Sequence, residues 1–335
     1  MASDAADQVP GSKTGLTGRG LTSLKEAIAA SLATPLVVAA AVVSAVLFFV
    51  GGMVIGFPTD GGSDTLLLHQ AVGPAMLVLA IVLLVVGTAA GTMLAGRVRY
   101  DAGWAAALVG LLVLRHVGES IYYTLDDAGT GVFVTMLVEL LVLSAVTTGL
   151  WSLLHLGREK GAMSPALRRW LELPGAKTRT ADRATKGDSW QTGLAHLGTA
   201  TGVCGLVVYF VAQNDDPMQT TVAVGLGGWL GALAAHANVP ARPAYWSFAA
   251  PLIVGVVGYV AAMLFTDPVR LALGEPGGPL KALAMPLPAE YLGAGIPMAM
   301  YGYVRARTKQ AEAVAGVAGA VAVDTAIEAA ASSSS

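Results

Sequence analysis

Long, nearly uninterrupted apolar runs are the feature that most constrains how this chain can fold. Several of these runs reach 20 residues or more, which is enough to cross a hydrocarbon core of about 30 Å. Charged residues make up only 13% of the chain, against about 25% in an average soluble domain. The sequence therefore predicts an all-α, polytopic helical membrane protein.

Eight transmembrane helices are predicted, separated by short polar links. We expect them at residues 34–57, 65–95, 101–124, 130–157, 192–212, 219–238, 247–266 and 283–304. The last run is the least regular, because Pro286, Pro288 and Pro297 interrupt it. Prolines inside a transmembrane helix kink it where neighbouring groups satisfy the freed carbonyls. The run Gly293–Pro297 resembles a broken helix of the kind that lines a substrate path, and Glu290 lies beside it.

Basic residues gather in alternate links, which indicates the orientation of the chain. The 158–190 loop alone holds eight Lys and Arg residues, whereas the links on the other side carry mainly aspartates. The positive-inside rule then places both termini in the cytoplasm. The expected domains are a tail (1–33), a four-helix membrane half (34–157), a basic cytoplasmic loop (158–190), a second four-helix membrane half (191–304) and a tail (305–335).

Partners and compartment follow from the same features. The lipid bilayer is the main expected partner, and anionic lipid headgroups are expected at the 158–190 loop, where a short helix carries both apolar and basic side chains. Binding to other protein subunits is also possible. The net charge of −2 gives no indication of nucleic-acid binding. Short loops and the lack of eukaryotic targeting signals favour a bacterial-type plasma membrane. The single cysteine, Cys204, excludes an intrachain disulfide and is expected to be a packing residue.

Ionisable side chains interrupt the apolar runs of the first half at similar depth. Each charge near the bilayer centre costs about 3 kcal/mol on insertion scales. Three consecutive spans nevertheless place such groups in their middle or outer parts. The residues are His69 and Gln70 in the second span, Arg115, His116 and Glu119 in the third, and Glu139 in the fourth. This shared depth favours a functional site.

Transport or conduction of a small solute or ion is the leading hypothesis for this cluster. Buried carboxylates and histidines exchange protons near neutral pH, so the glutamates and the two histidines would relay protons or hold a coupling ion. Arg115 would set the local field or bind an anionic substrate. A structural alternative is a simple ion pair between Arg115 and Glu119, which are four residues apart on one helix.

Other uses of the same residues remain open. The protein could instead be a haem- or quinone-binding membrane subunit of a redox complex, and His69 and His116 would then be the axial ligands of the haem. His69, His116, Glu119 and Glu139 also offer nitrogen and oxygen ligands for a metal, although Arg115 nearby is unfavourable. A further alternative is a non-catalytic scaffold or assembly subunit. No set of nucleophile, base and acid points to an enzyme.

Two weaker patterns lie outside the cluster. His155, His196 and His236 are all expected near the cytoplasmic face, either as ordinary boundary residues or as a second haem or metal site. Glycines four residues apart are expected to pack helices within the chain. They are the pairs Gly52 and Gly56, Gly87 and Gly91, Gly198 and Gly202, and Gly227 and Gly231. No sequence repeat relates the two halves.

Overall fold

Helices account for nearly all of the structure, and no strand occurs among the residues described. The computed structural model describes residues 35–52, 73–95, 100–115, 131–159, 189–214, 216–241, 244–265, 280–310 and 312–313. The long helices are Pro35–Gly52, α2 (Gly73–Ala95), α3 (Tyr100–Arg115), α5 (Gly131–Glu159), α7 (Trp190–Val211), α8 (Pro217–Asn238) and α9 (Tyr245–Phe265). Two short segments, α11 (Lys281–Ala284) and α12 (Pro288–Glu290), come next, and a π-helical turn, η2 (Tyr291–Gly295), then leads into a helix over 296–310.

The membrane class is confirmed. Six of these helices are long and apolar enough to cross a membrane: Pro35–Gly52, α2, α5, α7, α8 and α9. Helix α3 is a shorter apolar helix in its described part. The eighth expected span corresponds to residues 288–310, which we call the last helix. The protein is therefore an all-α polytopic membrane protein, and six of the eight expected spans meet this test of length and composition.

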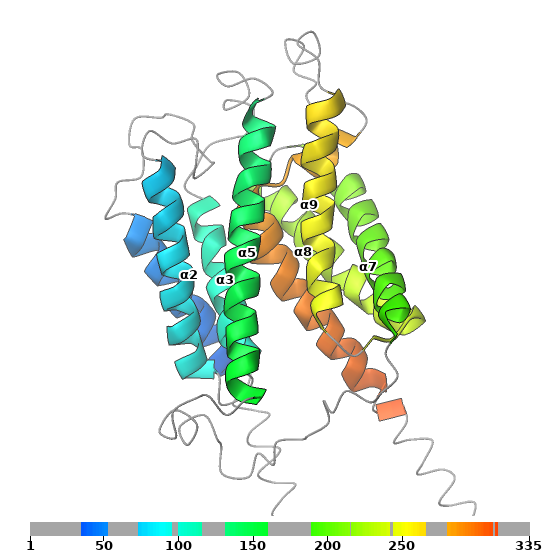
Figure 1. Ribbon diagram of the computed structural model, residues 1–335, viewed down its shortest axis with the longest axis horizontal. Coiled ribbons are helices and arrows are strands. Elements are labelled where there is room, and N and C mark those ends of the chain that lie inside the picture. Colours follow the sequence, from blue (N-terminus) through cyan, green and yellow to red (C-terminus); the bar gives the residue numbers. More distant parts are fainter. Residues whose placement is uncertain are drawn as a thin grey trace, which may run out of the picture.

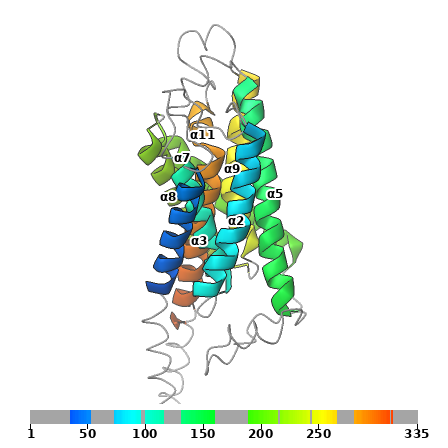
Figure 2. The same cartoon turned by 90° about the vertical axis from the view of Figure 1, so that its left-hand side faces the viewer.

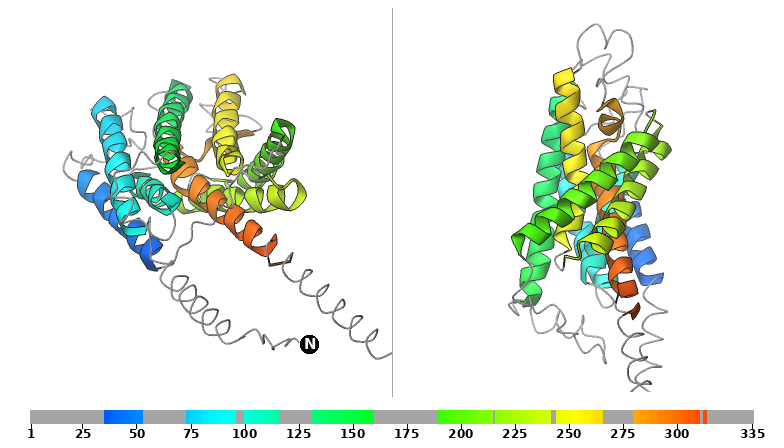
Figure 3. Two further views of the ribbon diagram at one scale, coloured as in Figure 1. Left: turned by 60° about the horizontal axis from the view of Figure 1, so that its bottom comes forward. Right: turned by 90° about the vertical axis from the view of Figure 1, so that its right-hand side faces the viewer.

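The helices stand in two rows when the bundle is viewed from below (Figure 3). One row contains α2, α5, α9 and α7, and the other contains Pro35–Gly52, α3, the last helix and α8 (Figures 1 and 2). Contacts between helices agree with this arrangement, since α5 lies against α2 and α9, and the π-helical part of the last helix lies against α3 and α8. Residues far apart in the sequence are thus neighbours in the middle of the bundle.

The contacts between helices follow a similar pattern in residues 35–159 and 190–310, and from this pattern we infer a pseudo-two-fold relation between these two halves of the described chain. It exchanges Pro35–Gly52, α2, α3 and α5 with α7, α8, α9 and the last helix, respectively. The contacts correspond: α2 packs on α3 as α8 packs on α9, and α2 packs on α5 as α8 packs on the last helix. Between the halves, α3 contacts the last helix as α9 contacts α5. Among the described residues each half has four long helices, so this relation pairs helices that run in the same direction, as in a parallel repeat.

The two halves share no extended sequence similarity. One local likeness is present, near the starts of α3 and α9. Trp104 is followed by three alanines and, six residues on, by Gly110. Phe248 is followed by two alanines and, seven residues on, by Gly255. These short matches are too common among membrane helices to be recognised without the fold.

Glycines allow several helices to approach closely, as expected. A Cβ at Gly227 would lie 2.9 Å from the carbonyl oxygen of Cys204, and one at Gly231 would lie 2.6 Å from that of Ala200. This packing leaves Cys204 fully buried, which confirms its expected role. Gly198 and Gly202 on α7 were also expected to pack helices within the chain. This expectation is wrong, because a Cβ added at either glycine meets nothing within 4 Å. Both of these glycines lie on the exposed side of α7.

Candidate functional site

The last helix is broken near its start, and the break depends on one diverted backbone bond. In a continuous α-helix the N–H of Leu287 would donate to the carbonyl of Leu283. Here it donates to Oε2 of Glu290 at 2.7 Å instead. Pro286 and Pro288 have no N–H, so they cannot restore the helical pattern across residues 285–287. The side chain of Glu290 therefore bonds back to the N-cap of its own helix, as the third residue of a capping box does.

Two tyrosines bond to the carbonyls near the break. The hydroxyl of Tyr291 donates to the carbonyl oxygen of Leu283 at 2.6 Å, taking the place of the missing Leu287 N–H. The hydroxyl of Tyr259 on α9 donates to the carbonyl oxygen of Pro286, also at 2.6 Å. Both tyrosine side chains are fully buried, and their rings meet edge to face with centroids 6.1 Å apart. An irregular backbone is tolerated inside a membrane protein where the protein itself satisfies these groups.

Glu290 is fully buried, and its second oxygen faces a different helix. Oε1 accepts hydrogen bonds from the hydroxyls of Thr220 at 2.6 Å and Thr221 at 2.9 Å, both near the start of α8. A carboxylate with both oxygens accepting has the hydrogen-bonding pattern of the ionised form. The arrangement is thus a buried acidic group where a broken helix meets a neighbouring helix.

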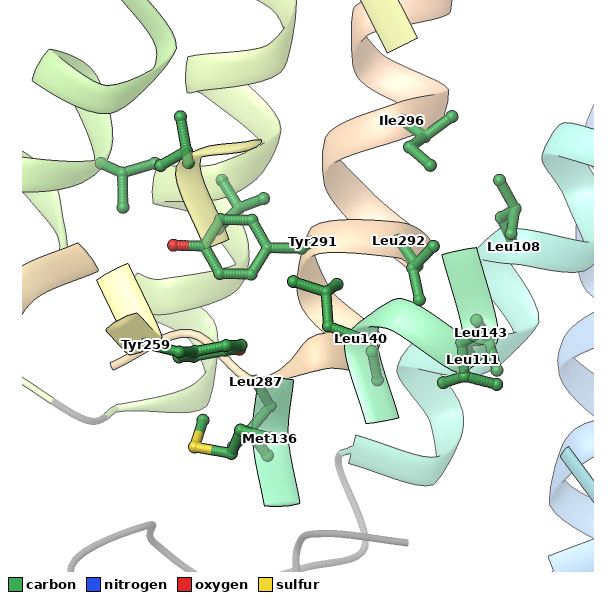
Figure 4. Close-up of a cluster of buried hydrophobic side chains, with 14 of the residues drawn as sticks. Leu108, Leu111, Met136, Leu140, Leu143, Tyr259, Leu287, Tyr291, Leu292 and Ile296 are labelled. Atoms are coloured by element: carbon green, nitrogen blue, oxygen red, sulfur yellow. The ribbon is translucent and has the colours of Figure 1, made fainter. Parts of the chain in front are cut away.

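Apolar side chains from both halves surround this region (Figure 4). Leu108 and Leu111 come from α3, Met136, Leu140 and Leu143 from α5, and Tyr259 from α9, and they gather around Leu287, Tyr291, Leu292 and Ile296 (Figure 4). All of them belong to one buried cluster that lies between the two halves. The buried carboxylate therefore stands beside the interface between the repeats.

Glu139 is the one member of the predicted cluster whose side chain the structure describes. It lies on α5 and is only 1% exposed, as expected of a buried polar residue. Leu140 follows Glu139 in the sequence, and Tyr291 follows Glu290. Both side chains contact Gly255 of α9, since a Cβ added there would lie 2.9 Å from Leu140 and 2.8 Å from Tyr291. The residues next to Glu139 and Glu290 therefore meet at the same point of α9.

The other predicted site residues are not placed relative to Glu139. Arg115 ends helix α3, and its side chain lies outside the described part of the structure. His69, Gln70, His116 and Glu119 also lie outside the described residues, as does most of the 158–190 loop. Their roles, including the proposed haem ligation by His69 and His116, stay predictions.

The histidines of the second half form a separate polar group near the opposite end of the bundle. His196 is fully buried, with Nδ1 2.7 Å from the carbonyl oxygen of Val239 and Nε2 2.8 Å from the hydroxyl of Ser247. The Nε2 of His236 lies 3.1 Å from Oε1 of Gln310, and the two imidazole centroids are 6.3 Å apart. Both nitrogens of His196 are thus engaged in joining three segments, which argues against the second haem or metal site.

His155 does not complete such a site. Its ring stacks on Trp151 of the same helix, with centroids 5.3 Å apart. Among the described residues, no group of three or more His, Cys, Asp or Glu side chains is arranged to hold a metal ion.

Sequence reasoning did not find the oxygen cluster around Glu290. The pattern Pro286, Pro288, Glu290 inside an apolar run was the available signal, because it combines a helix break with an acidic residue. Thr220 and Thr221 carried no signal, since hydroxyls near a helix start are common and usually bond within their own helix. Comparison with protein-family models, curated proteins and solved structures finds no match to this chain.

Proposed function

We propose that this protein transports or conducts a small solute or ion across the membrane, using buried carboxylates at the interface between its two halves. The observation that carries the proposal is Glu290, a fully buried carboxylate at a helix break. Many transporters consist of two repeats, with the substrate and coupling-ion sites at the repeat interface on interrupted helices. Parallel repeats with an axis along the membrane normal are one of the two known arrangements.

The pairing of Glu290 with Glu139 supports the same proposal. Burying a carboxylate is expensive, and here both halves bury one on equivalent helices. A requirement of packing alone would be met by apolar residues in either half. Two acidic positions on helices that the inferred pseudo-two-fold relation pairs suit a path that a cation or a proton follows between the halves.

The sequence-predicted cluster extends this path. Arg115 lies at the end of α3, whose preceding turns contact the last helix, so its backbone is close to the interface. Glu119, four residues further along the sequence, would then carry protons together with Glu139. Replacing Glu119 with Gln is expected to abolish proton-coupled flux and to leave folding intact.

The test uses the purified full chain in liposomes that contain a pH-sensitive dye. Gradients of H⁺, Na⁺, K⁺ and Cl⁻ are imposed one at a time, and ion flux is compared with protein-free liposomes. Glu290→Gln and Glu139→Gln are expected to lose most of the flux. Glu312→Gln is the matched control, because Glu312 is exposed beyond the last helix. Equal flux in all variants would refute the role of the buried carboxylates.

A further inference from the structure

His236, in the last turn of α8, has one ring nitrogen that takes part in no hydrogen bond. Its Nε2 lies 3.1 Å from Oε1 of Gln310. This oxygen can only accept, so Nε2 carries the hydrogen and Nδ1 of the neutral ring is bare. Nδ1 is buried, and no residue that the structure describes is its hydrogen-bond partner. The whole side chain is only 6% exposed. A bare imidazole nitrogen can bind a proton, a ligand that needs no cavity.

The neighbouring histidine, His196, does not share this property. Its Nδ1 donates to the carbonyl oxygen of Val239 at 2.7 Å, and its Nε2 lies 2.8 Å from the hydroxyl of Ser247. This hydroxyl donates to the neutral ring, and after rotation it accepts from the protonated ring. His196 therefore keeps two hydrogen bonds in either charge state. A protonated His236 would instead carry a buried N–H without an acceptor, which is costly.

The groups that face His236 from the neighbouring helices also oppose a positive charge on its ring. Helix α7 contributes His196, with imidazole centroids 6.3 Å apart, and α9 contributes the uncharged Ser247 behind it. The last helix contributes Tyr303, whose ring centroid lies 5.3 Å from that of His236. The guanidinium carbon of Arg307 lies 5.8 Å from the centroid of the same tyrosine ring. Arg307 thus already places one cation beside Tyr303, and a protonated His236 would add a second.

The bond between His236 and Gln310 joins the end of α8 to the end of the last helix. Further into the bundle the two helices pack closely, because a Cβ added at Gly302 would lie 2.5 Å from the carbonyl oxygen of Trp229. At the end of the bundle, by contrast, Gln310 is exposed, and so are residues 237 and 238 of α8. The end of the last helix can therefore separate from α8 while the packing at Gly302 is kept.

We propose that His236 is a pH switch: the neutral ring holds the end of the last helix against α8, and protonation of the ring releases it. In this step Nδ1 takes a proton from water, which gives an imidazolium ion with two N–H groups. Separation of the helices exposes the new N–H to water and moves the charge away from Arg307. An exposed histidine has a pKa of about 6.5. Because the released state binds the proton, the helices are joined above about pH 6.5 and separate as the pH falls below it.

The switch lies at the end of the bundle opposite to Glu290. Helix α8 and the last helix both begin near Glu290, where Thr220 bonds to it, and both end near His236 and Gln310. The sequence predicts that this end faces the cytoplasm, so the switch would respond to cytoplasmic pH. The inference is independent of the proposed transport function, because it concerns how two helices pack and not whether an ion passes.

The test measures the distance between the two helix ends as a function of pH. Spin labels are attached to the purified full chain in detergent at Ala237→Cys and Lys309→Cys, both at exposed positions. The native Cys204 is fully buried and stays unlabelled. Between about pH 7.5 and about pH 5.5 we expect the ratio of separated to joined ends to rise about 10-fold, because a released ring of ordinary pKa gains its proton over this range. A distance distribution that does not change with pH would overturn the switch.

Two variants assign the pH response to one histidine. His236→Gln keeps an N–H donor for Gln310 and does not bind a proton in this pH range, so its helix ends are expected to stay joined throughout. His155→Gln is the matched control, because His155 lies on α5, where its ring stacks on Trp151. This control should keep the full response. A pH response that persists in His236→Gln, or one that is lost in His155→Gln, would contradict the proposal.

A second measurement uses the chain without substitutions, so it does not depend on the folding of any variant. Nitrogen NMR of the labelled protein follows the imidazole nitrogens over the same pH range. At about pH 7.5 we expect His236 to show a protonated Nε2 and a bare Nδ1. Nδ1 should gain its hydrogen over the pH range in which the helix ends separate. Separation of the ends while Nδ1 stays bare, or a protonated Nδ1 while the ends stay joined, would overturn the switch.

Discussion

Trp104 and Phe248 meet where the two halves of the protein face each other, with ring centroids 5.6 Å apart. Trp104 lies near the start of α3 and Phe248 near the start of α9, two helices that the inferred pseudo-two-fold relation pairs. Both side chains are buried. Trp104 also donates from Nε1 to the carbonyl oxygen of Thr147 on α5 at 3.0 Å, which ties α3 to the neighbouring helix of its own half. The aromatic contact thus closes the interface at the end opposite to Glu290.

Removing the hydroxyl of Tyr291 is expected to destabilise the protein, because this hydroxyl donates to a carbonyl at the helix break. In Tyr291→Phe the buried carbonyl of Leu283 loses the donor that replaces its helical partner. An unsatisfied buried acceptor costs about 1–3 kcal/mol, so we expect a lower Tm in detergent. Tyr301→Phe is the control, because Tyr301 is 56% exposed on the same helix. Equal Tm values for the two variants would show that the Tyr291 hydroxyl does not hold the break.

Close packing of α7 and α8 predicts different outcomes at two glycines. In Gly231→Ala the new Cβ would lie 2.6 Å from the carbonyl oxygen of Ala200, so the helices must separate. Overpacking of this kind costs about 1–3 kcal/mol. Gly198→Ala places its Cβ where no atom lies within 4 Å, and its stability should be unchanged or slightly higher. Thermal unfolding of both variants checks the difference, and a fully stable Gly231→Ala would contradict so close an approach of these two helices.

The neighbours of His196 fix its tautomer. The carbonyl of Val239 can only accept, so Nδ1 carries the hydrogen. In the neutral ring Nε2 then accepts from the hydroxyl of Ser247. We expect nitrogen NMR of the labelled protein to show one histidine with a protonated Nδ1 and a bare Nε2. Ser247→Ala should change the Nε2 signal and lower the Tm, whereas a ring protonated at Nε2 alone would contradict the assignment.

The predicted orientation can be tested with two cysteine variants. Asn214, between α7 and α8, and Glu312, beyond the last helix, are both exposed and lie at opposite ends of the bundle. In intact cells a membrane-impermeant maleimide is expected to label Asn214→Cys. It should label Glu312→Cys only after permeabilisation. The native Cys204 is fully buried and gives the unlabelled background. The reverse pattern would show that both termini lie on the outer side.

Local patterns in the sequence predicted the helices well and the candidate site only in part. Pro286 and Pro288 indicated an interrupted last span, and Glu290 was recognised beside it. Its partners were not, because Thr220 is 70 residues away in the sequence and its hydroxyl differs in no local feature from that of Thr199, which bonds within its own helix. A hydrogen bond of such long range depends on how helices pack, and no pattern within either helix contains that information.

The sequence by itself determined that this protein lies in a membrane as a set of helices. Apolar length is a local property, and in a bilayer an apolar segment must satisfy its own backbone groups, which a helix does. Only the tertiary structure decided which helices are neighbours, since apolar surfaces pack against lipid and against each other with similar energy. The two rows, the pseudo-two-fold relation and the meeting of α8 with Glu290 arise from specific close contacts, such as that of Gly228 with the carbonyl oxygen of Gly295. Such contacts depend on shape, which is established only when the helices come together.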